Sequence, residues 1–178
     1  MKGIIFSEFL TLVEDKFGLD ICQQILDDNN DTGAYTSVGT YDHLALVKLI
    51  VSLSKLTGIS VEQLQEVYGK SIFINLYQSM PGLEGKTKST FEFVKSVEEY
   101  IHIEVKKLYH NAMPPEFIFI SETKAQLVMD YHSARCLSHV CLGLLHGCAE
   151  HFNEKIHIDM DPLNPQESEV RFCLTLGE

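Results

Sequence analysis

The spacing of apolar residues changes at Pro114-Pro115, and that change restricts the fold class more than any other feature. Before the two prolines, apolar residues recur every three or four positions, which is typical of amphipathic helices. After them the spacing becomes two, which is typical of β-strands. Because proline disfavours helical backbone at the residue before it, the pair should also end the last helix of the first part.

Turn and capping signals delimit the predicted helices. Ser60 followed by Gln63, and Ser89 followed by Glu92, are capping-box patterns that mark two helix starts. Gly69 is a weak point inside one of these helices, because glycine lowers helix propensity. We therefore expect helices over residues 4–17, about 20–28, 40–56, 61–78 and 90–111, with a break at Met80-Pro81-Gly82.

The part after the prolines contains four predicted strands and one helix. We expect strands over residues 117–120, 126–134, 155–160 and 170–176, with a helix from about residue 137 to 152 between the second and the third. A short polar turn joins the first two strands and predicts a hairpin. The fold class is therefore α+β: an N-terminal helical subdomain followed by a four-stranded antiparallel sheet with helices.

Length and charge exclude several classes of function. A chain of 178 residues with 45% hydrophobic content is long enough for one domain that encloses a ligand-sized cavity. With 14 basic and 25 acidic residues the formal charge is −11, and this negative field repels a phosphate backbone, so we expect no nucleic acid partner. The longest apolar run, residues 44–53, contains Lys48 and is too short to span a bilayer. Because Glu8 and Glu14 interrupt the apolar N-terminus too early for a signal peptide, we expect a cytoplasmic protein with no membrane partner.

A row of polar side chains continues an apolar strand face near the end of the second predicted strand. Tyr131, Ser133 and Arg135 follow Leu127 and Met129 at a spacing of two, which in a strand places all five on one face. Two hydroxyls and a guanidinium are donors suited to carboxylates, and arginine can bind one through two parallel hydrogen bonds. Taken alone, such a row is more often an arginine that pairs with a protein carboxylate, beside two ordinary polar residues.

His102 lies at the edge of the buried face of the last predicted helix, one step round from Val94, Ile101 and Val105. From there its side chain can point into a cavity. A neutral imidazole in such a position is a good axial ligand for a haem iron. A partly buried, hydrogen-bonded histidine of no special role is the commoner occurrence at this kind of position.

Cysteine and acidic clusters indicate no further site. Cys136 and His139 stand three apart on a helix and could form part of a zinc site with Cys141, but Cys141 lies on the apolar side and no second ligand pair has suitable spacing. An odd number of cysteines without a CxxC motif predicts reduced core thiols. The acidic turn at residues 27–33 could bind a cation weakly, but it is more simply a solvated loop. No GxSxG, HExxH or P-loop motif is present.

Together the polar row and the histidine resemble the signature of the bacterial H-NOX family, the haem nitric oxide/oxygen-binding domains related to the haem sensor domain of soluble guanylate cyclase. The most specific element is the family's Tyr-x-Ser-x-Arg motif, present as Tyr131, Ser133 and Arg135. The family's proximal histidine, shortly before a Pro-Pro pair, is matched by His102 and Pro115. The resemblance covers essentially the whole chain from the opening Met1-Lys2-Gly3-Ile4-Ile5 onward.

The resemblance implies a role for each matched residue. The Tyr-x-Ser-x-Arg residues would hold the propionates of haem b (iron protoporphyrin IX), and His102 would be the axial ligand of the haem iron. Pro115 would pack against the porphyrin and help to distort it. The haem would lie buried between a distal helical subdomain, at about residues 1–60, and a haem-anchoring and proximal subdomain, residues 61–178, of a single H-NOX domain.

The resemblance also implies which gas the other side of the haem accepts. Oxygen-binding members supply a tyrosine donor where this chain has Val140, and the asparagine that supports it is replaced by Ser71. With Ile5, Phe9 and Leu144 resembling other pocket positions, the implied distal side is apolar. Since NO binds ferrous iron tightly without a donor, we expect binding of NO and CO with exclusion of O₂. Tyr77 would restore O₂ binding if it reached this pocket.

The implied function is a gas sensor and not an enzyme. Binding of NO would release His102, and the signal would pass to a separate histidine kinase or cyclic-di-GMP synthase or phosphodiesterase. Residues 161–171 contain no cysteine or histidine, unlike the zinc-binding subset of the family, so we expect no zinc. One alternative is a haem enzyme of the peroxidase or NO dioxygenase type, but such an enzyme needs distal acid–base groups that the implied pocket lacks. The other is a haem carrier, which would bind haem less tightly than the Tyr-x-Ser-x-Arg residues imply.

Overall fold

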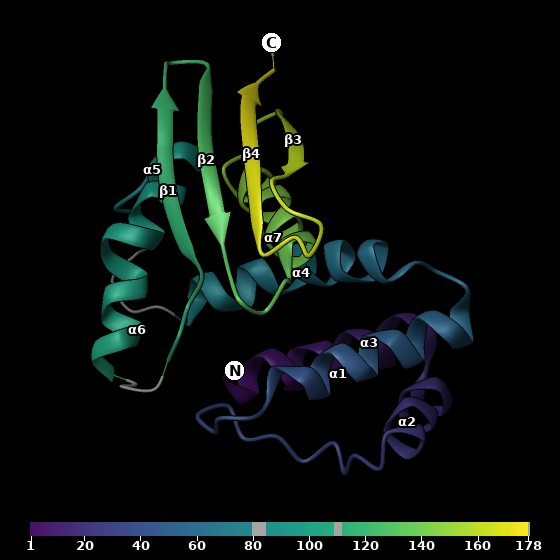
Figure 1. Ribbon diagram of the computed structural model, residues 1–178. Helices are drawn as coiled ribbons and strands as arrows, with labels where there is room; N and C mark the ends of the chain where they lie inside the picture. Colours follow the sequence, from purple (N-terminus) through teal and green to yellow (C-terminus); the bar gives the residue numbers. More distant parts are fainter. Residues whose placement is uncertain (80–84, 109–111, 178) are drawn as a thin grey trace.

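The computed structural model describes residues 1–79, 85–108 and 112–177. The predicted break at Met80-Pro81-Gly82 and the predicted helix end at residue 111 lie outside these residues. The described chain has a helical part, which carries the N-terminus, and a sheet part, which carries the C-terminus (Figure 1). The α+β class with a four-stranded antiparallel sheet is confirmed.

Four helices make up the first part of the chain: α1 (Gly3–Phe17), α2 (Leu19–Asp28), α3 (His43–Thr57) and α4 (Val61–Gln78). The Ser60 side chain caps α4 as predicted and accepts a hydrogen bond from the Gln63 amide. Helix α3 begins at residue 43 instead of 40, because the Asp42 side chain caps it by accepting from the Leu44 amide. Among the described residues no single helix is long and apolar enough to cross a membrane; α3 and α4 reach that length only together, across a bend of 115°.

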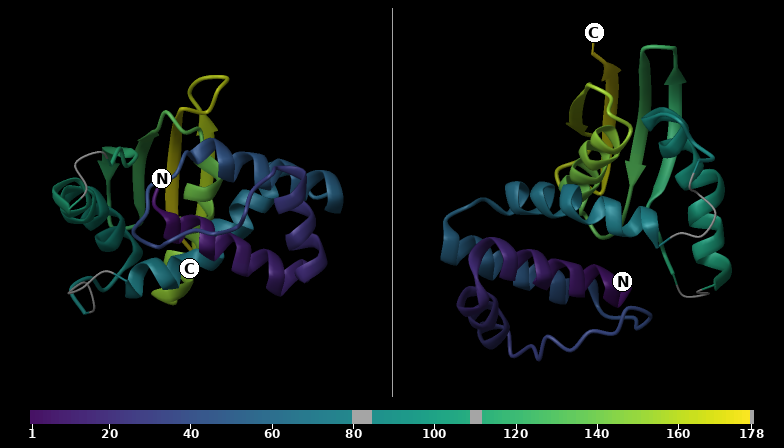
Figure 2. Two further views of the ribbon diagram at one scale, coloured as in Figure 1. Left: turned by 90° about the horizontal axis from the view of Figure 1, so that it is seen from below. Right: turned by 180° about the vertical axis from the view of Figure 1, so that it is seen from behind.

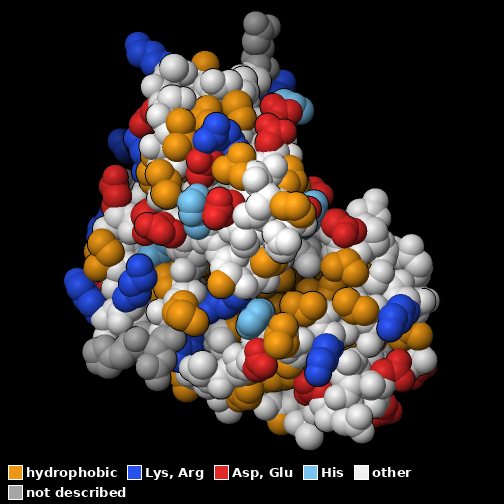
Figure 3. All heavy atoms as spheres, in the orientation of Figure 1, with side chains coloured by type: hydrophobic (Ala, Val, Ile, Leu, Met, Phe, Trp, Pro, Cys, Tyr) orange, Lys and Arg blue, Asp and Glu red, His pale blue; other side chains and the backbone are white. Residues whose placement is uncertain are grey.

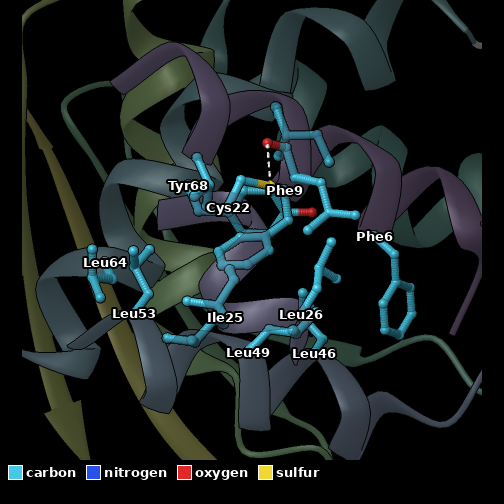
Figure 4. Packing of buried hydrophobic residues seen from close by; sticks show 14 residues of the cluster. Phe6, Phe9, Cys22, Ile25, Leu26, Leu46, Leu49, Leu53, Leu64 and Tyr68 are labelled. Atoms are coloured by element: carbon cyan, nitrogen blue, oxygen red, sulfur yellow. Dashed lines mark hydrogen bonds between the residues drawn. The ribbon is translucent and has the colours of Figure 1, made fainter. Parts of the chain in front are cut away.

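A buried apolar core joins α1, α2, α3 and the first half of α4 (Figure 4). Phe9, Ile25 and Leu49 are among its fully buried members. The ring of Phe9 meets the ring of Tyr68 edge-on, with centroids 5.4 Å apart. Each such side chain stabilises the fold by about 2 kcal/mol, so this core fixes α4 against the N-terminal helices.

Helix α4 crosses α7 (Ser138–His151) at a distance that requires glycine on both sides. A Cβ atom on Gly69 would lie 2.1 Å from the Val140 carbonyl oxygen, and one on Gly143 would lie 2.0 Å from the Glu66 carbonyl oxygen. The expectation of a weak point at Gly69 is wrong, because α4 continues through this residue and uses its missing side chain for close packing.

The last helix before the prolines is not the single α-helix that the sequence predicts. It consists of α5 (Thr90–Ser96), a π-helical turn (Val97–Ile101, the π turn) and α6 (His102–Leu108). The π turn is closed by the His102 amide, which donates to the Val97 carbonyl five residues back. Such turns insert one extra residue into a helix and are frequent at functional sites.

The sheet consists of β1 (Glu116–Glu122), β2 (Gln126–His132), β3 (Ile156–Pro162) and β4 (Glu169–Leu176), in the order β1-β2-β4-β3 with all neighbours antiparallel. Met129 is opposite Phe119 on one side and Phe172 on the other, so the central strand β2 supplies the middle of the inner face. Helices α5 and α7 pack against this face, and no helix of the described residues covers the other face (Figure 2).

Strand β2 ends at His132, two residues earlier than predicted. Ser133 and Arg135 therefore do not continue the strand face of Tyr131 but lie in the turn that follows it. The turn is closed by the Ser133 amide, which donates to the Ser168 carbonyl at 2.8 Å, and by the Cys136 amide, which donates to the Ser133 carbonyl. Cys136 has a positive φ of 51°, a conformation that no strand allows.

Candidate functional site

A cavity of about 880 Å³ lies where the helical part meets the sheet part. Its size is that of sites for cofactors and other large ligands. The space-filling view shows hydrophobic side chains gathered along this junction (Figure 3). Most of the lining is apolar, with contributions from α1, α4, α5, the π turn, α7 and the sheet, including Ile4, Leu76, Phe93, Val97, Phe117 and Leu145.

His102 forms part of the wall of this cavity and is 8% exposed. Its Nδ1 atom lies 2.8 Å from Oε2 of Glu98, whereas Nε2 makes no hydrogen bond with a described residue. Burial lowers the pKa of His102, although the bond to Glu98 opposes this shift. The imidazole is therefore neutral at pH 7, with one nitrogen occupied and the other available to a metal.

Tyr131, Ser133 and Arg135 line the same cavity. Burial raises the pKa of Tyr131, which keeps the hydroxyl protonated and able to donate. The Ser133 hydroxyl accepts from the Arg135 amide at 3.3 Å, and this bond holds the turn that carries both residues. The motif is brought to one place by a strand end and a turn instead of by strand alternation.

The guanidinium of Arg135 makes no ion pair with a carboxylate of the described residues. The sheet does contain the ordinary arginine–carboxylate pair that the sequence left open, but it is formed by Arg171, whose Nε and Nη2 donate to the two oxygens of Asp130 at 2.7 and 2.8 Å. Arg135 is thus a cation at the edge of an apolar cavity without such a partner. This donor set fits haem, which is a flat apolar group with two carboxylates and an iron.

The other predicted site residues divide into two groups. Ile5, Pro115, Val140 and Leu144 line the cavity. Phe9 does not, because it is directed into the helical core and borders a separate cavity of about 240 Å³.

Ser71 is outside the large cavity as well. It is exposed, and its hydroxyl donates to the Tyr68 carbonyl within helix α4 at 3.0 Å. Ser71 was expected to replace an asparagine of the gas pocket, but it is not among the residues that line the cavity.

Two tyrosines of α4 line the cavity, of which the sequence raised only one. Tyr68 is fully buried, and its hydroxyl donates to the Ile5 carbonyl. Tyr77 is 6% exposed, and its ring lies against His151, with ring centroids 4.4 Å apart. The Tyr77 hydroxyl makes no hydrogen bond with a described residue, so the lining is not wholly apolar. Helical spacing alone could not show Tyr68 at this wall, because its signal is that of an ordinary core position.

Glu98 is the other residue that the sequence did not single out. Its Oε2 atom contacts both His102 and the backbone amide of Phe117, the latter at 3.1 Å. The signal available in the sequence was the spacing of four between Glu98 and His102, which places two helical residues on the same side.

Comparisons with known proteins place this fold in one group. The model of the family described as haem-NO-binding matches residues 2–160. The Fe(II) unliganded H-NOX protein from K. algicida is 38% identical, with a TM-score of 0.94 over 100% of this chain and 97% of that one. The IWP-051-bound H-NOX from Shewanella woodyi, in the Fe(II)CO ligation state, is 33% identical, with a TM-score of 0.84 over 99% and 95%.

A third solved structure shares the fold at lower identity. The H-NOX protein from S. oneidensis in the Fe(II)NO ligation state is 24% identical, with a TM-score of 0.90 and full coverage of both chains. At this level of identity the likeness concerns the fold alone. Among curated protein sequences, none matches this chain significantly.

Proposed function

Because the chain belongs to the haem-NO-binding family and is a haem-binding gas sensor domain of the H-NOX type, we propose that it senses NO at ferrous haem b, excludes O₂ and regulates a separate signalling protein. The observation that carries this proposal is the pair of unsatisfied groups in one cavity: the Arg135 guanidinium without a carboxylate among the described residues, and the His102 imidazole with Nε2 unbonded to them. One suits a propionate and the other an iron.

Haem binding in this cavity would use contacts of two kinds. Arg135, Ser133 and the Tyr131 hydroxyl would donate hydrogen bonds to the propionates, with arginine supplying the charge-assisted ones. His102 would bind the iron through Nε2, and Pro115 would pack against the haem plane. When bound, the haem would supply a ferrous iron that can bind a diatomic gas.

The selectivity for NO would follow from the side chains near the gas. Val140 and Leu144 carry no hydrogen-bond donor, and the Tyr68 hydroxyl is committed to the Ile5 carbonyl. Bound O₂ needs a donor for the charge on its outer oxygen, whereas NO and CO do not. Tyr77 is the hydroxyl on this wall that would overturn O₂ exclusion if it donated to the gas.

Signalling would follow from the release of His102. Binding of NO would weaken the bond between His102 and the iron, which would free the imidazole so that α6 would no longer be held at the cavity. Helix α6 belongs to the proposed proximal subdomain, residues 61–178. It would then shift relative to the proposed distal helical subdomain, at about residues 1–60. The two positions present different surfaces to a cytoplasmic histidine kinase or cyclic-di-GMP synthase or phosphodiesterase.

Absorption spectra of the reduced holoprotein test this proposal. We expect the reduced protein to have the spectrum of histidine-ligated ferrous haem, and this spectrum should not change in air. With NO it should change to the spectrum of a nitrosyl haem without a histidine ligand. A stable oxy spectrum would contradict the selectivity. Turnover of peroxide, or of NO together with O₂, would favour the haem enzyme alternative, and rapid loss of haem to an acceptor apoprotein would favour a haem carrier.

A further inference from the structure

One oxygen atom of Glu98 connects the candidate iron ligand to the sheet. Oε2 lies 2.8 Å from Nδ1 of His102 and 3.1 Å from the backbone nitrogen of Phe117. Glu98 is on the π turn, and Phe117 is the second residue of β1. The contact therefore joins two elements across the segment that contains Pro114-Pro115.

The double contact is made by a residue of the π turn. Glu98 lies on this turn four residues before His102, and the two side chains are in direct contact; the turn ends at Ile101, and His102 begins α6. The Glu98 side chain is 25% exposed and the His102 side chain 11%. At this degree of burial the contacts are only partly screened by solvent, so a hydrogen bond to the carboxylate has more effect than on an open surface.

On the outer side of β1, the Phe117 amide has no strand of the described residues to pair with. Strand β1 is at the edge of the sheet, and Phe117 is opposite Tyr131 of β2 on its inner side. Its amide donates to Glu98 instead. Because a backbone amide is always a donor, this bond fixes the position of the carboxylate whatever the state of the histidine.

A fixed carboxylate at Nδ1 determines how the imidazole can act. It accepts a hydrogen bond from Nδ1–H, which leaves Nε2 as the nitrogen with a free electron pair, and this bond makes the ring a stronger electron donor. The Phe117 ring, whose centroid is 5.5 Å from that of His102, restricts the ring orientation further.

We propose, resting on the proposed function, that Glu98 is the positioning residue of His102: it strengthens the histidine–iron bond and couples the histidine to the edge strand β1. The coupling has a direction. Glu98 stays bound to the Phe117 amide, so a movement of His102 alters the hydrogen bond at that amide and the position of the start of β1. Phe117 also lines the cavity.

Three single variants separate charge from position. In Glu98→Gln one amide oxygen can still accept from both donors, but the negative charge is gone. In Glu98→Ala both hydrogen bonds are lost. Glu99→Gln is the matched control, because Glu99 is the exposed neighbour of Glu98 on the same turn. This substitution removes the same charge without affecting the contact with His102.

The readouts are the iron–histidine stretching band of the ferrous holoprotein by resonance Raman spectroscopy, the rate of haem transfer to an acceptor apoprotein, and hydrogen exchange at the Phe117 amide. We expect the band to move to lower wavenumber in Glu98→Gln and further in Glu98→Ala. Haem transfer should accelerate about tenfold or more in Glu98→Ala, as for other partners of metal-bound histidines. Exchange at Phe117 should accelerate about tenfold in Glu98→Ala only.

The outcomes distinguish the two levels of the argument. If the parent protein shows no iron–histidine band, the proposed haem ligation by His102 is wrong. If it shows the band and all three variants keep the parent position and transfer rate, haem ligation stands and the role of Glu98 is refuted. A change in Phe117 exchange without a change in the band would reduce Glu98 to a structural contact of β1 and would also refute the inference.

Discussion

Replacing Arg135 by alanine should weaken haem binding while costing the protein no ion pair of its own. The guanidinium lines the cavity and is not paired with a described carboxylate, so its removal leaves none of them without a partner. A hydrogen bond to a charged group contributes about 2 kcal/mol, which corresponds to about a 30-fold change in affinity. We therefore expect haem transfer from Arg135→Ala to an acceptor apoprotein to be about 30-fold faster than from the parent.

Arg171→Ala is the matched control, because it removes the same type of side chain from β4, the strand that pairs with β2. Its loss leaves Asp130, which is only 8% exposed, without its two donors. Since the Arg171 side chain is 41% exposed, we expect a cost of about 1 kcal/mol and a thermal midpoint about 3 °C lower. Haem transfer should stay within about twofold of the parent rate, well below the change expected from a lost charged hydrogen bond. Equal haem transfer in the parent and Arg135→Ala, or equal acceleration in both variants, would refute the reasoning.

Three further perturbations test other parts of the structure. His102→Gly should abolish the NO-dependent spectral change to a histidine-free form, whereas added imidazole should restore haem binding in the same spectra; a variant that still loses a protein ligand with NO would contradict ligation by His102. Gly143→Ala should lower the free energy of unfolding by about 2 kcal/mol and the thermal midpoint by about 6 °C. The reason is that the new Cβ overlaps the Glu66 carbonyl, and the cost of this overlap outweighs the gain in helix propensity. Unchanged or raised stability would show that the two helices separate without cost. The hydrogen bonds from Arg171 hold the pKa of Asp130 below its usual value, so this pair contributes fully above about pH 4 and its contribution is lost as the pH falls through the lowered pKa. Acid unfolding of Asp130→Asn should therefore depend less steeply on pH than that of the parent, and identical acid profiles would refute this contribution.

Much of the architecture follows from local pattern. The change of spacing at Pro114-Pro115 predicts the order of helices and strands, and the cap at Ser60 predicts the start of α4, because these features depend on residues within one or two turns of each other. The strand that ends at His132 was predicted two residues too long, because its end depends on a residue far away in the sequence. Its end is set by a bond from the Ser133 amide to the Ser168 carbonyl, 35 residues further along the chain.

The candidate site shows the same division between local and distant causes. Residue type and spacing bring attention to Tyr131, Arg135 and His102, and all three line one cavity. Spacing does not distinguish the core position of Phe9 from the wall position of Tyr68, since both belong to the buried faces of amphipathic helices. Only the packing of α1 against α4 decides which of them borders the cavity.

The sequence by itself determined the fold class, the chemical types of the site residues and their family resemblance. The tertiary structure decided three things that the spacing of residue types does not report. Arg171 pairs with Asp130, 41 residues away, whereas Arg135 is left for the cavity. A π turn interrupts the helix before His102, and Glu98 bridges that histidine to the edge of the sheet. Periodicity reports which side of an element is buried, but which partner it is buried against depends on how the elements pack.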